Sequence, residues 1–172
     1  MKKIYFAGKF NLLKDDSLTL QDKLIDDYRY YILGSPQKLV YYNNEIYIKD
    51  KIHYLGPFYC EKASNGDFTS TDCTTVLNNE RKFVIDCDIF FVVFDYSFSV
   101  GSIVELGWAL NMNKRIIILY RAEPTKYSIK SEYWFAIADA MEKSNKLSVY
   151  KYSDENELKC KIDNILEELC QV

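Results

Sequence analysis

Runs of consecutive apolar residues recur along the chain and predict the strands of a sheet. The runs DIFFVVFD (88–95) and RIIILY (115–120) are almost continuously apolar, which is typical of central parallel strands covered on both faces. Shorter β-prone runs at KKIYFAG (2–8), KIHYLGPFY (51–59) and KLSVYKY (146–152) predict three further strands. We therefore expect a sheet of about five strands.

Segments with the helical spacing of apolar residues separate these strands. The predicted helices cover 17–34, 71–87, a segment opened by Gly101 and Ser102, 131–143, and 154–170, the last opened by Asp154 with Glu157. This alternation predicts one doubly wound α/β domain over residues 1–172, flavodoxin-like or Rossmann-like, with a mostly parallel sheet and helices on both faces. Two β-prone runs around Asn43–Asn44 predict a small inserted hairpin.

Composition narrows the class of function. The net charge is −3 with basic residues spread along the chain, so neither a nucleic acid polymer nor a membrane surface is an expected partner. The five cysteines are widely spaced and odd in number, which argues against a disulfide framework and favours a cytoplasmic location. With His53 as the single histidine, we expect neither a metal site nor a cofactor.

Two glutamates lie among apolar residues, where burial of a charged carboxylate would be unfavourable without a partner. Glu105 lies near Gly101 in what we expect to be the first turn of its helix, where the helix dipole alone could account for it. Glu80 has Phe83 and Val84 one turn after it, so helical spacing places it on the core-facing side. A buried carboxylate is costly, so either Glu80 lies at a pocket rim with partners or its helix is rotated.

The fold places a ligand beyond the carboxyl ends of the strands, where the strand order reverses. The segments expected to meet there are the end of the first strand (5–10), the loop 95–101 and the helix start that holds Glu105. Together, IYFAG (4–8), NNE (78–80) and VGSIVELGWALNMNKRIIIL (100–119) resemble the nucleoside 2-deoxyribosyltransferase family. The resemblance covers the first strand and residues 71–121, whereas 35–70 diverges.

This resemblance implies cleavage of the N-glycosidic bond between a base and a deoxyribose, with transfer of the sugar to another base. It assigns Glu105 as the nucleophile that attacks C1′, Tyr5 as the residue that positions it, and Glu80 as the acid that protonates the leaving base. The family usually carries aspartate where this chain has Glu80. A nucleotide-binding module without turnover is the alternative, since a fold alone does not imply catalysis.

Ser99, six residues before Glu105, bears on whether the 5′ end of the substrate carries a hydroxyl or a phosphate. The transferases usually have an aspartate there for the sugar hydroxyl, whereas the related deoxynucleoside 5′-monophosphate N-hydrolases have serine. Serine beside the free N–H groups near Gly101 favours a phosphate, with Lys9 as counter-charge, unless Asp95 replaces the missing aspartate. Hydrolysis of a monophosphate is therefore the near-equal rival of base exchange.

The remaining expected contacts come from the first strand and from a neighbouring subunit. Gly8 and Phe10 at the end of the first strand, and Phe58 at the end of the next, are expected to contact the substrate. The family's sites are completed by a second subunit, which implies a homo-oligomer. Here the residue from that subunit is Ser131, with Lys130 as the alternative.

Overall fold

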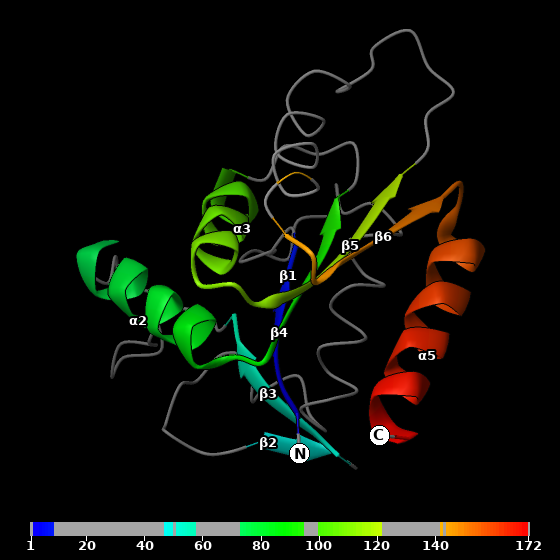
Figure 1. The fold of residues 1–172 in the computed structure, drawn as a ribbon, viewed down its shortest axis with the longest axis horizontal. Helices are drawn as coiled ribbons and strands as arrows, with labels where there is room; N and C mark the ends of the chain where they lie inside the picture. The colour runs from blue at the N-terminus through cyan, green and yellow to red at the C-terminus, as the bar shows by residue number, and fades with distance from the viewer. Residues whose placement is uncertain are drawn as a thin grey trace, which may run out of the picture.

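A six-stranded sheet forms the centre of the protein. The computed structural model describes residues 2–8, 47–49, 51–57, 73–94, 100–121, 142 and 144–171. The strands are β1 (Lys2–Ala7), β2 (Tyr47–Lys49), β3 (Ile52–Gly56), β4 (Ile89–Phe94), β5 (Arg115–Arg121) and β6 (Leu147–Tyr152), in the order β2-β3-β1-β4-β5-β6 (Figure 1). All neighbours pair in parallel except β2 and β3. The prediction of five parallel strands is confirmed.

The strand order creates a switch point beside β1. Without β2, the order β3-β1-β4-β5-β6 is the flavodoxin-like arrangement, in which the chain leaves β1 toward one edge and then continues toward the other. Ligands of such folds bind at the crevice where these directions part. In this protein the strand order changes direction between β1 and β4, so a ligand is expected there.

Helices cover both faces of the sheet, as the sequence predicts. Helices α2 (Cys73–Asp86) and α3 (Val100–Asn111) lie on one face, and α5 (Glu155–Gln171) lies on the other (Figure 1). The helix expected at 17–34 lies outside the described residues, as does the one at 131–143 apart from Glu142. Among the described residues, α2 and α3 therefore form the layer on one face of the sheet, and α5 forms the layer on the opposite face.

The two central strands, β1 and β4, form a buried core rich in aromatic residues. All six residues of β4 are buried, which explains its continuous apolar run. The register pairs Tyr5 with Phe90 and Phe6 with Phe91, and both ring pairs stack, with centroids 5.6 Å and 4.5 Å apart. Successive side chains alternate between faces, so Tyr5 lies on one face and Phe6 on the other.

The edge strand β2 forms a hairpin with β3. Its register runs antiparallel, from Tyr47 opposite Tyr54 to Lys49 opposite Ile52. The turn expected at Asn43–Asn44 lies outside the described residues, and the second run predicted for that hairpin overlaps β2. The strand that follows the insertion is β3, as expected for KIHYLGPFY.

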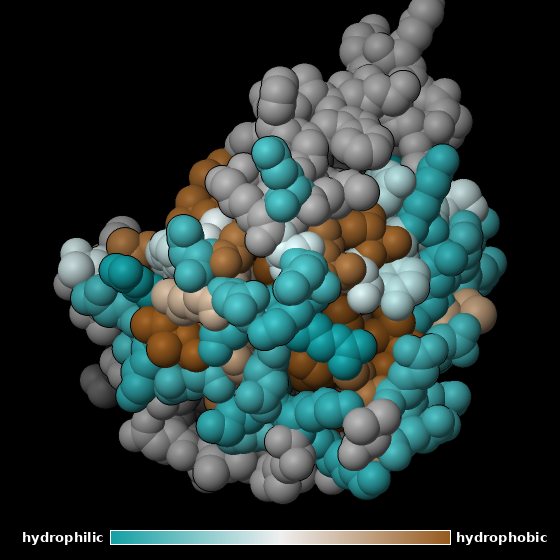
Figure 2. Space-filling view, in the orientation of Figure 1, coloured by the Kyte–Doolittle hydropathy of each residue, from teal (hydrophilic) through white to brown (hydrophobic). Residues whose placement is uncertain are grey.

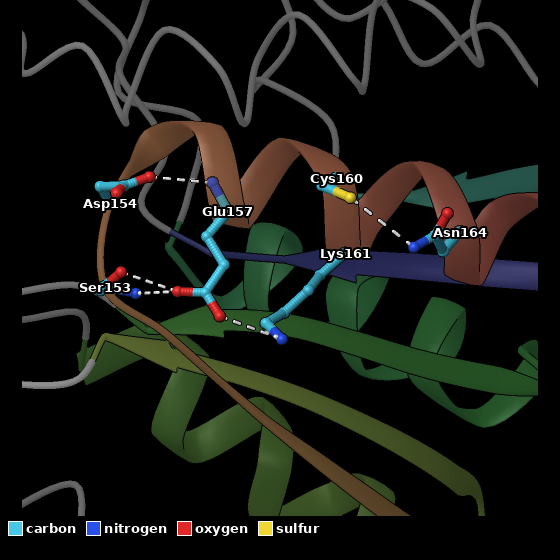
Figure 3. Close-up of polar contacts among 6 residues, drawn as sticks. All are labelled: Ser153, Asp154, Glu157, Cys160, Lys161 and Asn164. Carbon is cyan, nitrogen blue, oxygen red and sulfur yellow. Dashed lines mark hydrogen bonds and ion pairs between the residues drawn. The ribbon is translucent and has the colours of Figure 1, made fainter.

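Helix α5 begins at a hydrogen-bonded cap. The Glu157 amide donates to Asp154 Oδ1 at 2.9 Å, while Glu157 Oε2 accepts from the amide (2.8 Å) and the hydroxyl (2.7 Å) of Ser153 (Figure 3). Lys161 pairs with the other oxygen of Glu157 at 3.2 Å. These contacts lower the pKa of Glu157, the hydroxyl bond being the largest cause. The predicted opening of the helix by Asp154 and Glu157 is confirmed.

The surface carries both hydrophilic and hydrophobic residues. On the face shown in Figure 2, hydrophilic residues cover most of α5, and hydrophobic residues are visible in the middle of the face, over the strands. Among the described side chains of α2 and α3, the large apolar ones that are exposed are Leu77, Ile85, Val100 and Val104. Among the described helices, none has the length and hydrophobicity needed to cross a membrane.

Candidate active site

One tyrosine hydroxyl joins two carboxyl groups from two helices. Tyr5 Oη lies 2.5 Å from Glu80 Oε2 on α2 and 2.7 Å from Glu105 Oε1 on α3. The two glutamates are 75 and 100 residues away from Tyr5 in sequence. The structure thus brings together, beside β1 and β4, the three residues to which the family resemblance assigns catalytic roles.

The ring of Tyr5 is held firmly in place. It is fully buried and stacks on Phe90 of β4 with an interplanar angle of 9°. On the other side of β1, the register pairs Tyr5 with Gly56 of β3, after a shift in register between Ile4 and Tyr5. The hydroxyl therefore extends toward α2 and α3 from a rigid base.

Helix α2 presents Glu80 toward the sheet. Asn79 and Arg81 on either side of it are exposed, whereas Phe83 and Val84 one turn later are buried against the core. Glu80 itself is half-buried at the boundary between these two faces. This confirms the expected core-facing position, and the Tyr5 hydroxyl is one partner of Glu80.

Helix α3 presents Glu105 from its second turn. Ser102, Leu106 and Ala109 are the buried residues of α3, and Glu105 lies half-buried beside Leu106. The expectation that Glu105 lies in the first turn was wrong, because the helix already includes Val100 and its first turn holds no acidic residue. The helix dipole acts mainly within the first turn, so it is not the main reason for this carboxylate. The contact with Tyr5 supplies that reason.

The hydroxyl of Tyr5 stays protonated over the whole working range of pH. Burial, followed by the negative charges of Glu105 and Glu80, raises the pKa of Tyr5 well above its ordinary value of 10.0. Ionised tyrosine would place its negative charge beside two acidic groups. The Tyr5 hydroxyl therefore keeps its proton and can always donate one hydrogen bond, and it does not act as a base.

The single proton of the Tyr5 hydroxyl limits the protonation states in which both carboxyl groups can be hydrogen-bonded to it. A phenol has one proton to donate and can also accept, so it can donate to one of its two carboxyl neighbours only. The second contact is a hydrogen bond only when the other carboxyl group carries a proton and donates it to Tyr5 Oη. Both contacts have the short length of charge-assisted O–H···O bonds. The arrangement therefore suits one proton shared by the two glutamates.

Two other predicted site residues are described. Gly8 is buried directly after β1, with φ 152°, and Gly101 is exposed in the first turn of α3. A side chain at Gly101 would meet none of the described residues within 4 Å. The other predicted contacts lie outside the described residues; they are Lys9, Phe10, Phe58, Asp95, Ser99, Lys130 and Ser131.

Sequence reasoning overlooked Gly56. It has φ 148°, is joined to Pro57 by a cis peptide, and lies against the ring of Tyr5. The Gly-Pro pair was a visible turn signal, but the sequence does not tell which ring packs against that turn.

The chemistry available here is that of carboxyl groups. No group of three or more His, Cys, Asp or Glu residues suited to a metal ion occurs in the part of the chain that the structure describes. A carboxylate and a carboxylic acid held side by side can stabilise a cation, form an ester and donate a proton.

Comparison with known proteins supports the fold. Neither a protein-family model nor a curated protein matches the sequence. Among solved structures, the chain is similar to a CMP N-glycosidase, BcmB, from Clostridium botulinum, with 18% identity and a TM-score of 0.54. The match covers 94% of this chain and 99% of that chain. At this identity the likeness shows that the two chains share an α/β fold.

Proposed function

We propose that this protein cleaves the N-glycosidic bond of a nucleoside or nucleoside 5′-monophosphate, with Glu105 as the nucleophile. The observation that carries the proposal is the bridge from Tyr5 to Glu80 and Glu105. The sequence resemblance assigns roles to the same three residues, and the structural neighbour is an N-glycosidase of a nucleotide. Three residues far apart in sequence thus meet at one hydroxyl, which supports the proposal.

In the first step, a Glu105 oxygen attacks C1′ while the C1′–N bond breaks and its electron pair leaves with the base. The base then needs a proton, and Glu80 donates the one that it holds against Tyr5 Oη. Tyr5 keeps its own proton directed at Glu105, which orients that carboxylate without neutralising it. The products are a glycosyl ester of Glu105, a neutral base and an ionised Glu80.

The separation of the two carboxyl groups supports a covalent route. One hydroxyl contacts both oxygens, at 2.5 and 2.7 Å, so these two oxygens are at most about 5.2 Å apart, no farther than the roughly 5–5.5 Å between the carboxyl groups of retaining glycosidases. Inverting enzymes need roughly 6.5–9.5 Å to admit a water molecule between the groups. The geometry therefore favours an ester at Glu105 over direct attack by water.

The second step decides between transfer and hydrolysis. Ionised Glu80 can remove the proton of an incoming base or of a water molecule, and the acceptor then attacks C1′ and releases Glu105. The resemblance favours base exchange, since the segment around VELGWAL is closest to the transferases. Ser99 and the likeness to a CMP N-glycosidase favour hydrolysis of a monophosphate. Both outcomes use the same ester.

We also propose that the working form is a homo-oligomer. The family resemblance implies that Ser131 of a second subunit completes the site. The exposed apolar residues Leu77, Val100 and Val104 belong to α2 and α3, the helices that carry the two glutamates. Burying them against a second copy would remove apolar surface from water. Full activity of a monomer in sedimentation and dilution assays would contradict this arrangement.

The test is to incubate the protein with deoxynucleosides, ribonucleosides and their 5′-monophosphates, with and without a second free base. Chromatography should show released base, exchanged base or both from at least one substrate class. Glu105→Gln should abolish the reaction, whereas the matched surface variant Glu168→Gln should retain it. Release of no base from any substrate by the folded wild-type protein would favour the binding-module alternative.

A further inference from the structure

Gly56 packs against the aromatic rings of Tyr5 and Phe83. It is the last residue of β3, and the sheet register places it opposite Tyr5. Its φ of +148° is one that residues with a side chain rarely adopt. A Cβ atom here would lie 3.0 Å and 3.2 Å from Cε2 and Cδ2 of Tyr5, and 3.3 Å from Cδ2 of Phe83.

Tyr5 and Phe83 are each linked to the hydrogen bond between Tyr5 and Glu80. Tyr5 supplies the hydroxyl, and Phe83 follows Glu80 by about one turn on α2. Carbon atoms pack best at about 3.5–4.0 Å, so an added methyl group would have to push Tyr5, Phe83 or both. The Tyr5 ring cannot simply retreat, because Phe90 of β4 is stacked against it on the opposite side of β1.

We propose that Gly56 is a positioning residue that fixes the contact between Tyr5 and Glu80. With no side chain, it allows β3, β1 and α2 to close together far enough for Tyr5 Oη and Glu80 Oε2 to reach 2.5 Å. Its effect on the reaction rests on the proposed function, because it acts through protonation of the leaving base. Its effect on the hydrogen bond does not.

The contact with Glu105 should respond less. Glu105 reaches Tyr5 from α3, whereas the nearest atoms to an added Cβ belong to Tyr5 and to Phe83 of α2. A push on the Tyr5 ring disturbs both contacts, and a push on Phe83 disturbs the Glu80 contact in addition, so the added methyl group acts more on the donor of the proton than on the nucleophile. Its kinetic signature is a defect that depends on how much the leaving base needs a proton.

The experiment compares Gly56→Ala with Gly107→Ala. Gly107 is the matched control, since a Cβ there meets no atom of the described residues within 4 Å and alanine is favoured in a helix. Circular dichroism verifies the fold of each variant. Proton NMR then follows the far-downfield hydroxyl signal expected of a short O–H···O bond, assigned by its absence in Tyr5→Phe.

The rate of base release is measured with an ordinary base and with one that leaves easily without a proton, such as 5-nitrouracil. We expect Gly56→Ala to lose the downfield signal and to slow release of the ordinary base by about tenfold or more, with a much smaller effect on the activated base. Gly107→Ala should match the wild type in both. In a Tyr5→Phe background, Gly56→Ala should add little further loss.

An unchanged NMR signal in folded Gly56→Ala would overturn the proposal, as would an equal loss for both leaving bases. If Gly56→Ala does not fold, adding Phe83→Leu to it makes room for the new methyl group on α2 but not against Tyr5: the folded double variant should still show a weakened downfield signal, and an unchanged signal would count against the proposal. If the wild type releases no base at all, the proposed function fails while the NMR comparison still decides the role of Gly56.

Discussion

Replacing Tyr5 with phenylalanine removes one oxygen atom and both hydrogen bonds of the bridge. The ring stays buried and stacked on Phe90, so the core loses no apolar contact. A hydrogen bond to a charged group contributes about 1.5–3 kcal/mol, and each 1.36 kcal/mol changes a rate about tenfold. If the bond to Glu105 is needed in the transition state, kcat/KM should fall by about 10- to 150-fold.

The pH profile of Tyr5→Phe separates this explanation from a general loss of packing. The hydroxyl stabilises the state in which one glutamate is ionised and the other protonated, because it donates to the first and accepts from the second. Its removal should move the acidic limb of the bell-shaped profile to higher pH and the alkaline limb to lower pH. The bell becomes narrower from both sides.

Steady-state rates over the pH range, together with a urea titration for each protein, measure this effect. An unchanged profile with a uniformly lower rate would mean that Tyr5 acts only through packing. A wild-type rate in Tyr5→Phe would refute the argument that the bridge organises the two carboxyl groups.

Three further predictions concern stability. Lys114→Met should lower the free energy of unfolding by about 1–3 kcal/mol in urea titrations, because Lys114 Nζ donates to Ile85 O (2.5 Å) and Cys87 O (2.7 Å) near the end of α2; a loss no larger than that of Lys82→Met on the exposed side of α2 would contradict this. The pKa of Glu157 is lowered in the folded state, so its contribution is present above the ordinary value of 4.5 and is lost as pH falls; Glu157→Gln should reduce the acid sensitivity of Tm, and the same sensitivity as the wild type would speak against the cap. The pKa of Tyr5 is raised in the folded state, so its contribution is complete below about pH 10 and is lost as pH rises further; Tyr5→Phe should resist alkaline unfolding better than the wild type, and equal sensitivity would count against the argument.

The sheet could be predicted from sequence because its strands are buried on both faces. The run at 89–94 needs no alternation when α2 and α3 cover one side and α5 the other, and this continuous pattern identifies a central strand. The start of α3 was harder to locate. Val100 is exposed and Gly101 is a weak helix former, so the apolar spacing that begins at Ile103 suggested a later start and placed Glu105 one turn too early.

The identity of the three central residues could be anticipated, but their geometry could not. Helical spacing indicated that Glu80 faces the core, and the resemblance grouped it with Tyr5 and Glu105. A single hydroxyl shared by both carboxyl groups depends on the packing of two helices against β1, over sequence separations of 75 and 100 residues. The role of Gly56 depends in addition on a ring approaching its backbone, which a Gly-Pro pair in a sequence does not reveal.

Trapping of the glycosyl ester tests the central claim most directly. The protein is quenched in acid during turnover of a substrate, or of its 2′-fluoro analogue to slow breakdown of the ester, and its peptides are analysed by mass spectrometry. We expect the mass of the sugar, with or without its phosphate, on the peptide that contains Glu105, and no such mass in Glu105→Gln. A sugar on a different residue, or turnover at the wild-type rate by Glu105→Gln, would contradict the assignment of Glu105 as the nucleophile.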